Sequence, residues 1–178
     1  MSLDSDSDAQ LVLAFQAGDE AAFEALYQRH RRSVFNVAYR LLGNSDSADD
    51  VAQEVFVKLY ISPRAYRPSA KLSTWLYRVT YNACIDEIRK RRSRPSEMPD
   101  SEIGHSPVSA MESDELARAV KEAIASLPEK QRAAVVLQRY EGLSYQEIAD
   151  VLKASVSAVE SLLFRARESL KTKLAPYE

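Results

Sequence analysis

The residues best suited to chemistry lie near the carboxyl end of the chain. The stretch from 144 to 170 reads SYQEIADVLKASVSAVESLLFRARESL and contains Ser-x-x-Glu twice, at Ser144/Glu147 and at Ser157/Glu160. This pattern is typical of a capping box, in which a hydroxyl and a carboxylate cover the free backbone N–H groups at a helix start. Two helix starts so close together predict a short helix, a tight turn and a second helix.

The second helix of this pair is expected to leave a polar and aromatic face outside its apolar stripe. The stripe comprises Val159, Leu162, Leu163, Ala166 and Leu170, and the outward set comprises Glu160, Ser161, Phe164, Arg165 and Glu168. An outward Phe beside an Arg suits contact with a thymine methyl group and a guanine edge in the DNA major groove. A helix-turn-helix places its second helix in that groove. An ordinary helical hairpin is the alternative.

The turn between the two helices is imperfect in sequence. Lys153 occupies a position where such turns often carry Gly. A left-handed backbone at a residue with a side chain costs about 1 kcal/mol. The helix-turn-helix interpretation therefore predicts a locally strained turn at Lys153.

Elsewhere, too, the chain is predicted to be helical. Apolar residues recur at helical spacing over residues 23–41, 48–59, 72–88, 116–127 and 133–140. In the last of these segments Ala133, Val136, Leu137 and Tyr140 are expected to point inward. Gly43 and Asn44 are expected to end the first helix, and no strand pattern or internal repeat is convincing. We therefore predict an all-α protein.

A serine-rich segment divides the chain into two predicted blocks. Residues 93–113, SRPSEMPDSEIGHSPVSAMES, contain three prolines and no apolar period, as is typical of a flexible linker. The predicted fold is therefore two small helical domains, residues 1–92 and 114–178, with the helix-turn-helix in the second.

Charge is strongly segregated along the first block. Residues 1–57 hold ten acidic and four basic residues (net −6), whereas residues 58–94 hold ten basic and two acidic residues (net +8). Such segregation suggests two different partners, one of them a polyanion. The alternative is a solvated surface whose opposite charges lie near one another in the fold.

Catalytic constellations are largely absent from the sequence. The four glycines are isolated, so no glycine-rich phosphate loop can form. His30 lies on an apolar stripe, where a core or boundary role is more common than metal binding. Cys84 is the only cysteine, which excludes an internal disulfide; it is interpreted as a small buried apolar residue, with a redox sensor as the alternative. We expect a binding protein with no catalytic residue, metal or cofactor.

The amino-terminal sequence and the length of the apolar runs indicate where in the cell the protein is expected. The first residues, MSLDSDSD, are acidic where a signal peptide would be basic. The longest aliphatic run, residues 133–137, is far too short to cross a bilayer. We expect a cytoplasmic protein without direct membrane insertion.

Three motifs, taken together and in order, resemble the extracytoplasmic-function (ECF) subfamily of bacterial sigma factors. YRLLGNSDSADDVAQEVFVKLY is similar to the family's regions 2.1–2.2, and STWLYRVTYNACIDEIRKRR to its regions 2.3–2.4. LPEKQRAAVVLQRYEGLSYQEIADVLKASVSAVESLLFRAR looks like its regions 4.1–4.2. The resemblance covers nearly the whole chain outside the linker and implies a transcription initiation factor.

For the first block, the resemblance implies contacts to polymerase and to the −10 promoter element. Asp50, Gln53 and Glu54 share one helix face, which in this family grips the clamp helices of the polymerase β′ subunit. Aromatic and basic residues of the +8 segment would hold single-stranded DNA by stacking and phosphate contacts. The expected −10 set is Tyr66, Arg67, Lys71, Trp75 and Arg78. The alternative is that Trp75 packs into the core.

For the second block, the family's −35 base-contacting positions fall on Glu160, Ser161, Phe164 and Arg165. Glu160 departs from the common basic residue there. It either accepts from a cytosine amino group or serves its own capping box.

The resemblance implies three kinds of partner: core RNA polymerase, promoter DNA in duplex and single-stranded form, and an anti-sigma factor. The main alternative is a stand-alone helix-turn-helix repressor, which would bind duplex DNA without polymerase. A helical nucleic-acid hydrolase ranks third, because the sequence lacks a cluster of metal ligands.

Overall fold

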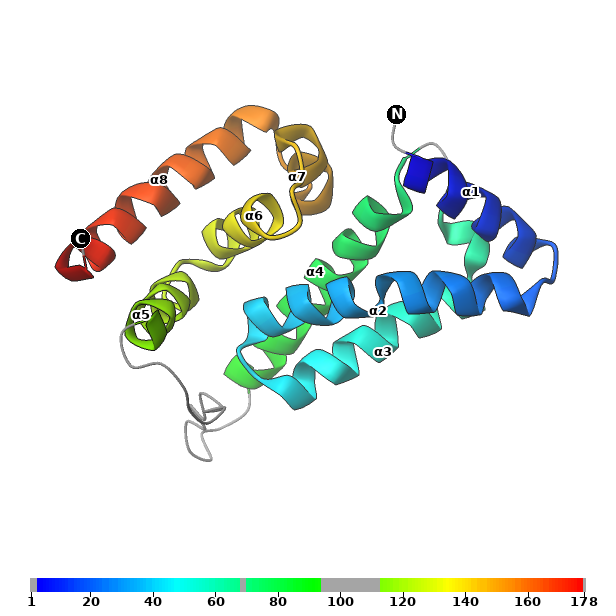
Figure 1. Cartoon of the computed structure of the whole chain (residues 1–178), viewed down its shortest axis with the longest axis horizontal. Helices are drawn as coiled ribbons and strands as arrows, with labels where there is room; N and C mark the ends of the chain where they lie inside the picture. The colour runs from blue at the N-terminus through cyan, green and yellow to red at the C-terminus, as the bar shows by residue number, and fades with distance from the viewer. Residues whose placement is uncertain (1–2, 68–69, 94–112, 178) are drawn as a thin grey trace. The chain divides into compact units, whose positions relative to one another are not determined.

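The protein is described by a computed structural model that covers residues 3–67, 70–93 and 113–177. These residues form eight α-helices and two 3₁₀ turns, with no strand among them (Figure 1). They divide into two compact units, Met1–Arg94 and Pro95–Glu178. The predicted all-α class with two helical units is therefore confirmed. All of the predicted linker except its two end residues lies outside the described part of the chain.

Three long helices form the body of the first unit: α2 (Glu20–Leu42), α3 (Ser45–Ile61) and α4 (Leu72–Ser93). Each of the three packs against the other two (Figure 1). Both ends of α2 are capped by local residues. At the start, the Asp19 carboxylate accepts from the backbone N–H of Ala21 at 3.0 Å, and at the end Gly43 adopts a left-handed φ of 71°. Leu26, Leu59 and Leu76 are fully buried between these helices.

An additional helix, α1 (Leu3–Gln16), precedes them and was not predicted. Its sequence, LDSDSDAQLVLAFQ, gathers its apolar residues at one end, so no helical stripe is evident. Tertiary packing supplies the missing support. Val12 is fully buried, and the Phe15 ring lies 5.1 Å from Phe23 and 5.6 Å from Tyr60, centroid to centroid.

The short turn η1 (Pro63–Ala65) connects α3 toward α4 and contacts both α1 and α3. The buried face of α4 is broad. It includes Leu72, Trp75, Leu76, Tyr77, Tyr81 and Cys84.

The second unit contains α5 (Ser113–Ala125), α6 (Glu129–Arg139), α7 (Tyr145–Leu152) and α8 (Val156–Leu174), followed by the turn η2 (Ala175–Tyr177). Helix α8 packs against α5, α6 and α7. One expected core residue is wrong: Tyr140 is 43% exposed because α6 ends at Arg139, so the tyrosine caps the helix and leaves its buried stripe.

Within the described ranges, none of the helices combines the length and the apolar character that a membrane span needs.

Candidate nucleic-acid and protein interfaces

Helices α7 and α8 form the helix-turn-helix, and its first helix begins as the sequence predicts. The Ser144 hydroxyl accepts from the Glu147 backbone N–H at 3.2 Å, and the Glu147 carboxylate accepts from the Ser144 N–H at 2.8 Å. The turn closes at Lys153, which has φ 51° and ψ 52° and donates its N–H to the Ala149 carbonyl. In the described ranges it is the one residue other than glycine with a positive φ. The strained turn is therefore confirmed.

The second predicted capping box is wrong. Helix α8 begins at Val156, and its cap is Ser155, whose hydroxyl accepts from the Ala158 backbone N–H at 3.1 Å. After the left-handed residue at Lys153 the chain returns to an extended backbone at Ser155, so the helix starts earlier than the pattern suggests. Glu160 therefore does not cap α8, and its carboxylate lies on the exposed surface of the helix.

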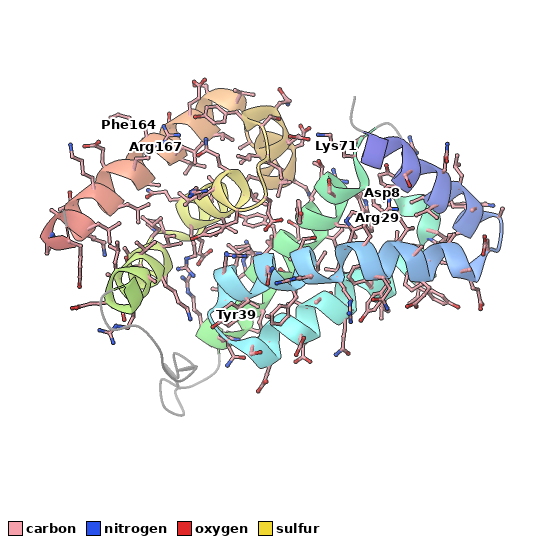
Figure 2. The ribbon with its side chains drawn as sticks, viewed as in Figure 1. Asp8, Arg29, Tyr39, Lys71, Phe164 and Arg167 are labelled. Atoms are coloured by element: carbon pink, nitrogen blue, oxygen red, sulfur yellow. The ribbon has the colours of Figure 1, made fainter. Side chains whose placement is uncertain are left out.

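The four predicted −35 residues share an exposed face of α8. Glu160, Ser161, Phe164 and Arg165 are all exposed, and the Phe164 side chain is exposed to 64%. Figure 2 marks Phe164 on this helix. On the opposite side of α8, the side chains of Val159, Leu163 and Ala166 are buried against the other helices of the unit.

A polar cluster beside this face was missed at the level of sequence. Arg167, labelled in Figure 2, donates to the Tyr145 hydroxyl at 3.2 Å and to the Gln138 side-chain oxygen at 3.4 Å. These hydrogen bonds join α8 to α7 and α6. The hydrogen bond from Arg167 is the main cause that lowers the pKa of Tyr145. The partners lie 22 and 29 residues away from Arg167, beyond the reach of any local pattern.

The predicted polymerase-contacting residues lie together on the outer face of α3. Asp50, Gln53 and Glu54 are exposed, whereas Val51 and Val55 on the other side of the helix are buried. The Glu54 carboxylate also pairs with Lys58 at 2.7 Å. A pair this exposed contributes only about 0.3–0.5 kcal/mol, so it leaves Glu54 available to a partner.

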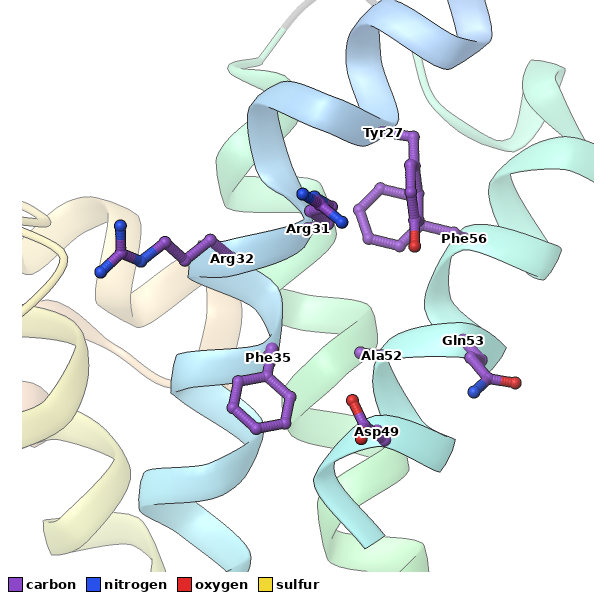
Figure 3. A pocket seen from close by; sticks show the side chains of 8 residues that line it. All are labelled: Tyr27, Arg31, Arg32, Phe35, Asp49, Ala52, Gln53 and Phe56. Atoms are coloured by element: carbon purple, nitrogen blue, oxygen red, sulfur yellow. The ribbon is translucent and has the colours of Figure 1, made fainter. Parts of the chain in front are cut away.

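A groove of about 330 Å³ between α2 and α3 extends this surface (Figure 3). Its floor is aromatic, since the Tyr27 and Phe56 rings meet edge to face at 4.9 Å and the Arg31 guanidinium lies 5.9 Å from the Tyr27 ring. The groove is lined by Tyr27, Arg31, Arg32 and Phe35 from α2 and by Asp49, Ala52, Gln53 and Phe56 from α3. Gln53 therefore belongs both to the exposed face and to the groove. The sequence alone did not indicate the groove, because it arises from the pairing of two helices.

The predicted −10 residues fall into two groups, and the aromatic group is buried. Tyr66 is 3% exposed and Trp75 is 9% exposed, and their ring centroids lie 6.2 Å apart. The Tyr66 hydroxyl donates to the Ala70 carbonyl at 2.5 Å. Neither ring is the open stacking surface that the sequence suggested. The alternative, in which Trp75 packs, describes the structure.

The basic group is accessible. Arg67 and Lys71 are exposed, and Arg78 is half-buried on α4. Figure 2 places Lys71 where α4 begins. Cationic side chains thus flank a packed pair of rings. Their part in DNA binding stays a prediction.

His30 and Cys84 occupy the places expected from sequence. His30 is 9% exposed and hydrogen-bonds to Asp8, as befits a boundary residue. Cys84 is fully buried, and burial raises the pKa of its thiol to about 12, so the reactive thiolate is strongly disfavoured. Over the described residues no three His, Cys, Asp or Glu side chains are grouped to hold a metal ion.

Comparison with known proteins gives the same division of the chain. The Sigma-70 region 2 family model matches residues 26–94, and the Sigma-70, region 4 model matches residues 117–170.

Two relatives match over nearly their whole length. The chain is similar to the RNA polymerase sigma-H factor of Pseudomonas aeruginosa PAO1, with 35% identity over 98% of this chain and 97% of that protein. It is also similar to the ECF RNA polymerase sigma factor SigW of Bacillus subtilis 168, with 33% identity over 88% of this chain and 91% of that protein.

A solved structure is similar in fold and length. CnrH, determined in complex with the cytosolic domain of CnrY, aligns with a TM-score of 0.74 and 28% identity. The alignment covers 97% of this chain and 99% of CnrH.

Proposed function

This chain belongs to the ECF subfamily of bacterial RNA polymerase sigma factors, and we propose which of its surfaces bind polymerase, the −10 element and the −35 element. As a sigma factor it acts in transcription initiation and is not an enzyme. The stand-alone repressor is not favoured, because the match includes region 2 as well as the helix-turn-helix. The observation that carries the proposal is this match over both units.

Polymerase binding is assigned to the outer face of α3. Asp50, Gln53 and Glu54 would bind the clamp helices of the β′ subunit through charge and amide hydrogen bonds. The neighbouring groove between α2 and α3 offers an aromatic floor for an apolar side chain of the same partner, with Arg31 and Asp49 at its rim. The acidic face would steer the polymerase electrostatically toward this surface, and the groove would pack against one of its apolar side chains.

Capture of the −10 element is assigned to the segment around the start of α4. Arg67, Lys71 and Arg78 would contact phosphates of the unpaired strand, and Tyr66 and Trp75 would meet a base at this site. Because both rings are buried in the free chain, stacking on them requires the segment to open when the strand binds. The −10 site is therefore proposed to adopt its binding conformation only when the unpaired strand binds.

Recognition of the −35 element is assigned to the exposed face of α8. Arg165 suits a guanine edge, Phe164 a thymine methyl group, and Glu160 a cytosine amino group, with Ser161 as a further polar contact. Arg167 and Tyr145, adjacent to this face, would bind backbone phosphates and fix the register of the helix.

An anti-sigma factor is proposed as the protein partner that restrains this chain. The structural neighbour CnrH was solved with a cytosolic domain bound to it. A partner that covers the α3 face would block polymerase binding without altering either DNA-binding surface.

Charge reversal on α3 tests the polymerase assignment. The double variant Asp50→Lys/Glu54→Lys should lose co-purification with core RNA polymerase while its helical circular dichroism stays unchanged. The matched control is Glu20→Lys/Glu24→Lys, which reverses two exposed acids with the same spacing on α2. Retained co-purification of the α3 variant would refute the assignment. Tight binding of wild-type protein to promoter duplex without polymerase would instead favour a repressor.

A further inference from the structure

A buried carboxylate fastens α1 to α2. Asp8 is 5% exposed; its Oδ1 accepts from Arg29 Nη1 at 2.5 Å and its Oδ2 lies 2.7 Å from His30 Nε2 (Figure 2). The Arg29 guanidinium also donates to the Ser7 hydroxyl at 3.2 Å. A buried carboxylate is stable only when charged or hydrogen-bonding partners replace its lost water. The hydrogen bonds of Asp8 therefore favour one packing position of α1 against α2.

The same helix holds the turn that leads to the −10 residues. At its carboxyl end, Gln16 donates its side-chain amide to the Pro63 carbonyl at 2.8 Å. Pro63 begins η1, and Tyr66 follows directly after that turn. Helix α1 also contacts α4, the helix that follows η1 in the chain. The described parts of the α3–α4 connection are thus supported from outside by α1.

Asp8 lies close enough to Tyr66 to act on it. Burial is the main cause that raises the pKa of Tyr66, and the negative charge of Asp8 raises it further. Tyr66 in turn packs against Trp75, with 6.2 Å between ring centroids. Hydrogen bonds therefore join Arg29 and His30 to Asp8, the charge of Asp8 acts on Tyr66, and Tyr66 packs against Trp75.

We propose that α1 is a positioning element for −10 capture, in which Asp8, held by Arg29 and His30, and Gln16, bonded to Pro63, fix the turn before Tyr66, so that the ring pair is correctly placed for the unpaired strand when the segment opens. This inference rests on the −10 assignment made above. Asp8 and Gln16 are positioning residues, since Gln16 bonds to the turn that precedes Tyr66 and Asp8 holds α1 against α2. Loss of either loosens the ring pair before any DNA is bound.

Trp75 provides a direct readout, because it is the single tryptophan of the chain. In Asp8→Asn and in Gln16→Ala, the Trp75 emission should shift to the red and acrylamide should quench it faster than in wild type. Glu24→Gln is the control, since it removes a carboxylate charge from an exposed site of the same unit. Unchanged emission and quenching in both α1 variants would overturn the inference.

A general loss of stability must be separated from positioning. Val37 is fully buried in α2, so Val37→Ala destabilises the same unit without touching α1 contacts to the turn. With core polymerase present, Asp8→Asn should weaken binding of a −10 single strand by about 5- to 10-fold, the scale of a modest coupling between sites. Affinity for core polymerase should stay within about twofold. A loss no larger than that of Val37→Ala would overturn the inference.

Two further outcomes are distinguishable. If Asp8→Asn does not fold, Gln16→Ala decides the matter by the same two readouts, since it removes one hydrogen bond and no charge. If the wild-type complex shows no preference for the −10 single strand, the proposed −10 function fails and this inference fails with it. A normal wild-type preference with unchanged variants overturns the inference alone.

Discussion

The two regions of this sigma factor that are proposed to bind DNA present their side chains in opposite ways. The α8 face is preformed: Glu160, Ser161, Phe164 and Arg165 all lie exposed on a helix whose other side is anchored. The −10 segment instead keeps Tyr66 and Trp75 buried and exposes only part of its basic set. Under the proposed assignments, the α8 face is ready for its ligand, whereas the −10 segment must open.

This difference matches the two forms of DNA that the two regions are proposed to bind. The major groove of a duplex accepts a rigid protruding helix, so α8 can contact bases without rearrangement. An unpaired base offers a ring face and needs an aromatic partner. Aromatic side chains left exposed in the free protein would form an apolar patch that favours aggregation. If the ring pair stays buried until a strand binds, the aromatic side chains are not exposed in the free protein and are still able to stack on a base.

The largest effect is expected where the preformed site is anchored. Leu163 is 1% exposed on the inner side of α8, and Leu163→Ala should destabilise the second unit by about 2–5 kcal/mol. Chemical unfolding followed by circular dichroism would measure this, together with binding to a −35 duplex. The Trp75 emission should not change, because Trp75 belongs to the first unit. A shifted Trp75 spectrum would show that the two sites are not independently built.

Specificity should depend on the exposed face itself. Arg165→Ala should cost about 1–3 kcal/mol of discrimination at one −35 base pair if the contact is bidentate. Binding to a panel of single-base duplex variants would reveal the position, with Glu168→Ala as an exposed control on the same helix. An equal loss on every duplex would instead mark Arg165 as a phosphate contact.

The turn that orients the preformed site can be relaxed. Lys153 has a left-handed backbone, so Lys153→Gly should stabilise the second unit by up to about 1 kcal/mol. Thermal unfolding would detect the gain, and −35 base preference should be retained because no exposed base-contacting residue changes. A loss of stability would indicate that the lysine side chain contributes more than its strained backbone costs.

On the −10 side, electrostatic contacts should act without sequence preference. Lys71→Ala should reduce the salt dependence of single-strand binding by about 0.7 in the logarithmic slope, the expected value for one lost phosphate contact. Titrations of the polymerase complex at several salt concentrations would measure the slope, with Lys130→Ala in the second unit as control. An unchanged slope would remove Lys71 from the −10 site.

Support of the −10 segment should weaken in acid. Burial alone would raise the pKa of Asp8, but hydrogen bonds and charges from His30 and Arg29 outweigh it, so the pKa lies below its ordinary value of 3.8. The resulting stability is present above that value and is lost as the pH falls through the folded pKa. The groups facing Asp8 are Arg29 and His30 on α2, Ser7 on α1 and Tyr66.

The free energy of unfolding, measured between neutral and strongly acidic pH, should therefore depend less steeply on pH for Asp8→Asn than for wild type. The two proteins should differ in stability most at neutral pH and converge in acid. Parallel pH profiles would show that Asp8 contributes no charge-dependent stability.

The sequence predicts the preformed site better than the hidden one, for a physical reason. The face of α8 follows from local periodicity, because an apolar stripe at helical spacing determines what is left outside. The strained turn at Lys153 follows from helix-turn-helix geometry. The ring pair, the Asp8 cluster and the α2–α3 groove depend on contacts between distant segments, which no local pattern contains.

Two errors of the sequence analysis concern where helices begin, and their causes differ. The Ser157/Glu160 pattern competes with Ser155, and the backbone after Lys153 decides in favour of the earlier serine. Helix α1 lacks a repeating stripe, so its helical state depends on packing of Val12 and Phe15 against the rest of the unit. Tertiary contact outweighs local preference in α1, whereas the local backbone decides where α8 begins.

Promoter melting tests the account most directly, because an initiation factor must hold unpaired bases whereas a repressor need not. Permanganate footprinting of a supercoiled promoter, with the intact chain and core polymerase, reports unstacked thymines. The thymines of the −10 element should be reactive, and Lys71→Ala and Asp8→Asn should each reduce this reactivity. Unreactive −10 thymines on a promoter that the complex demonstrably occupies would contradict the account.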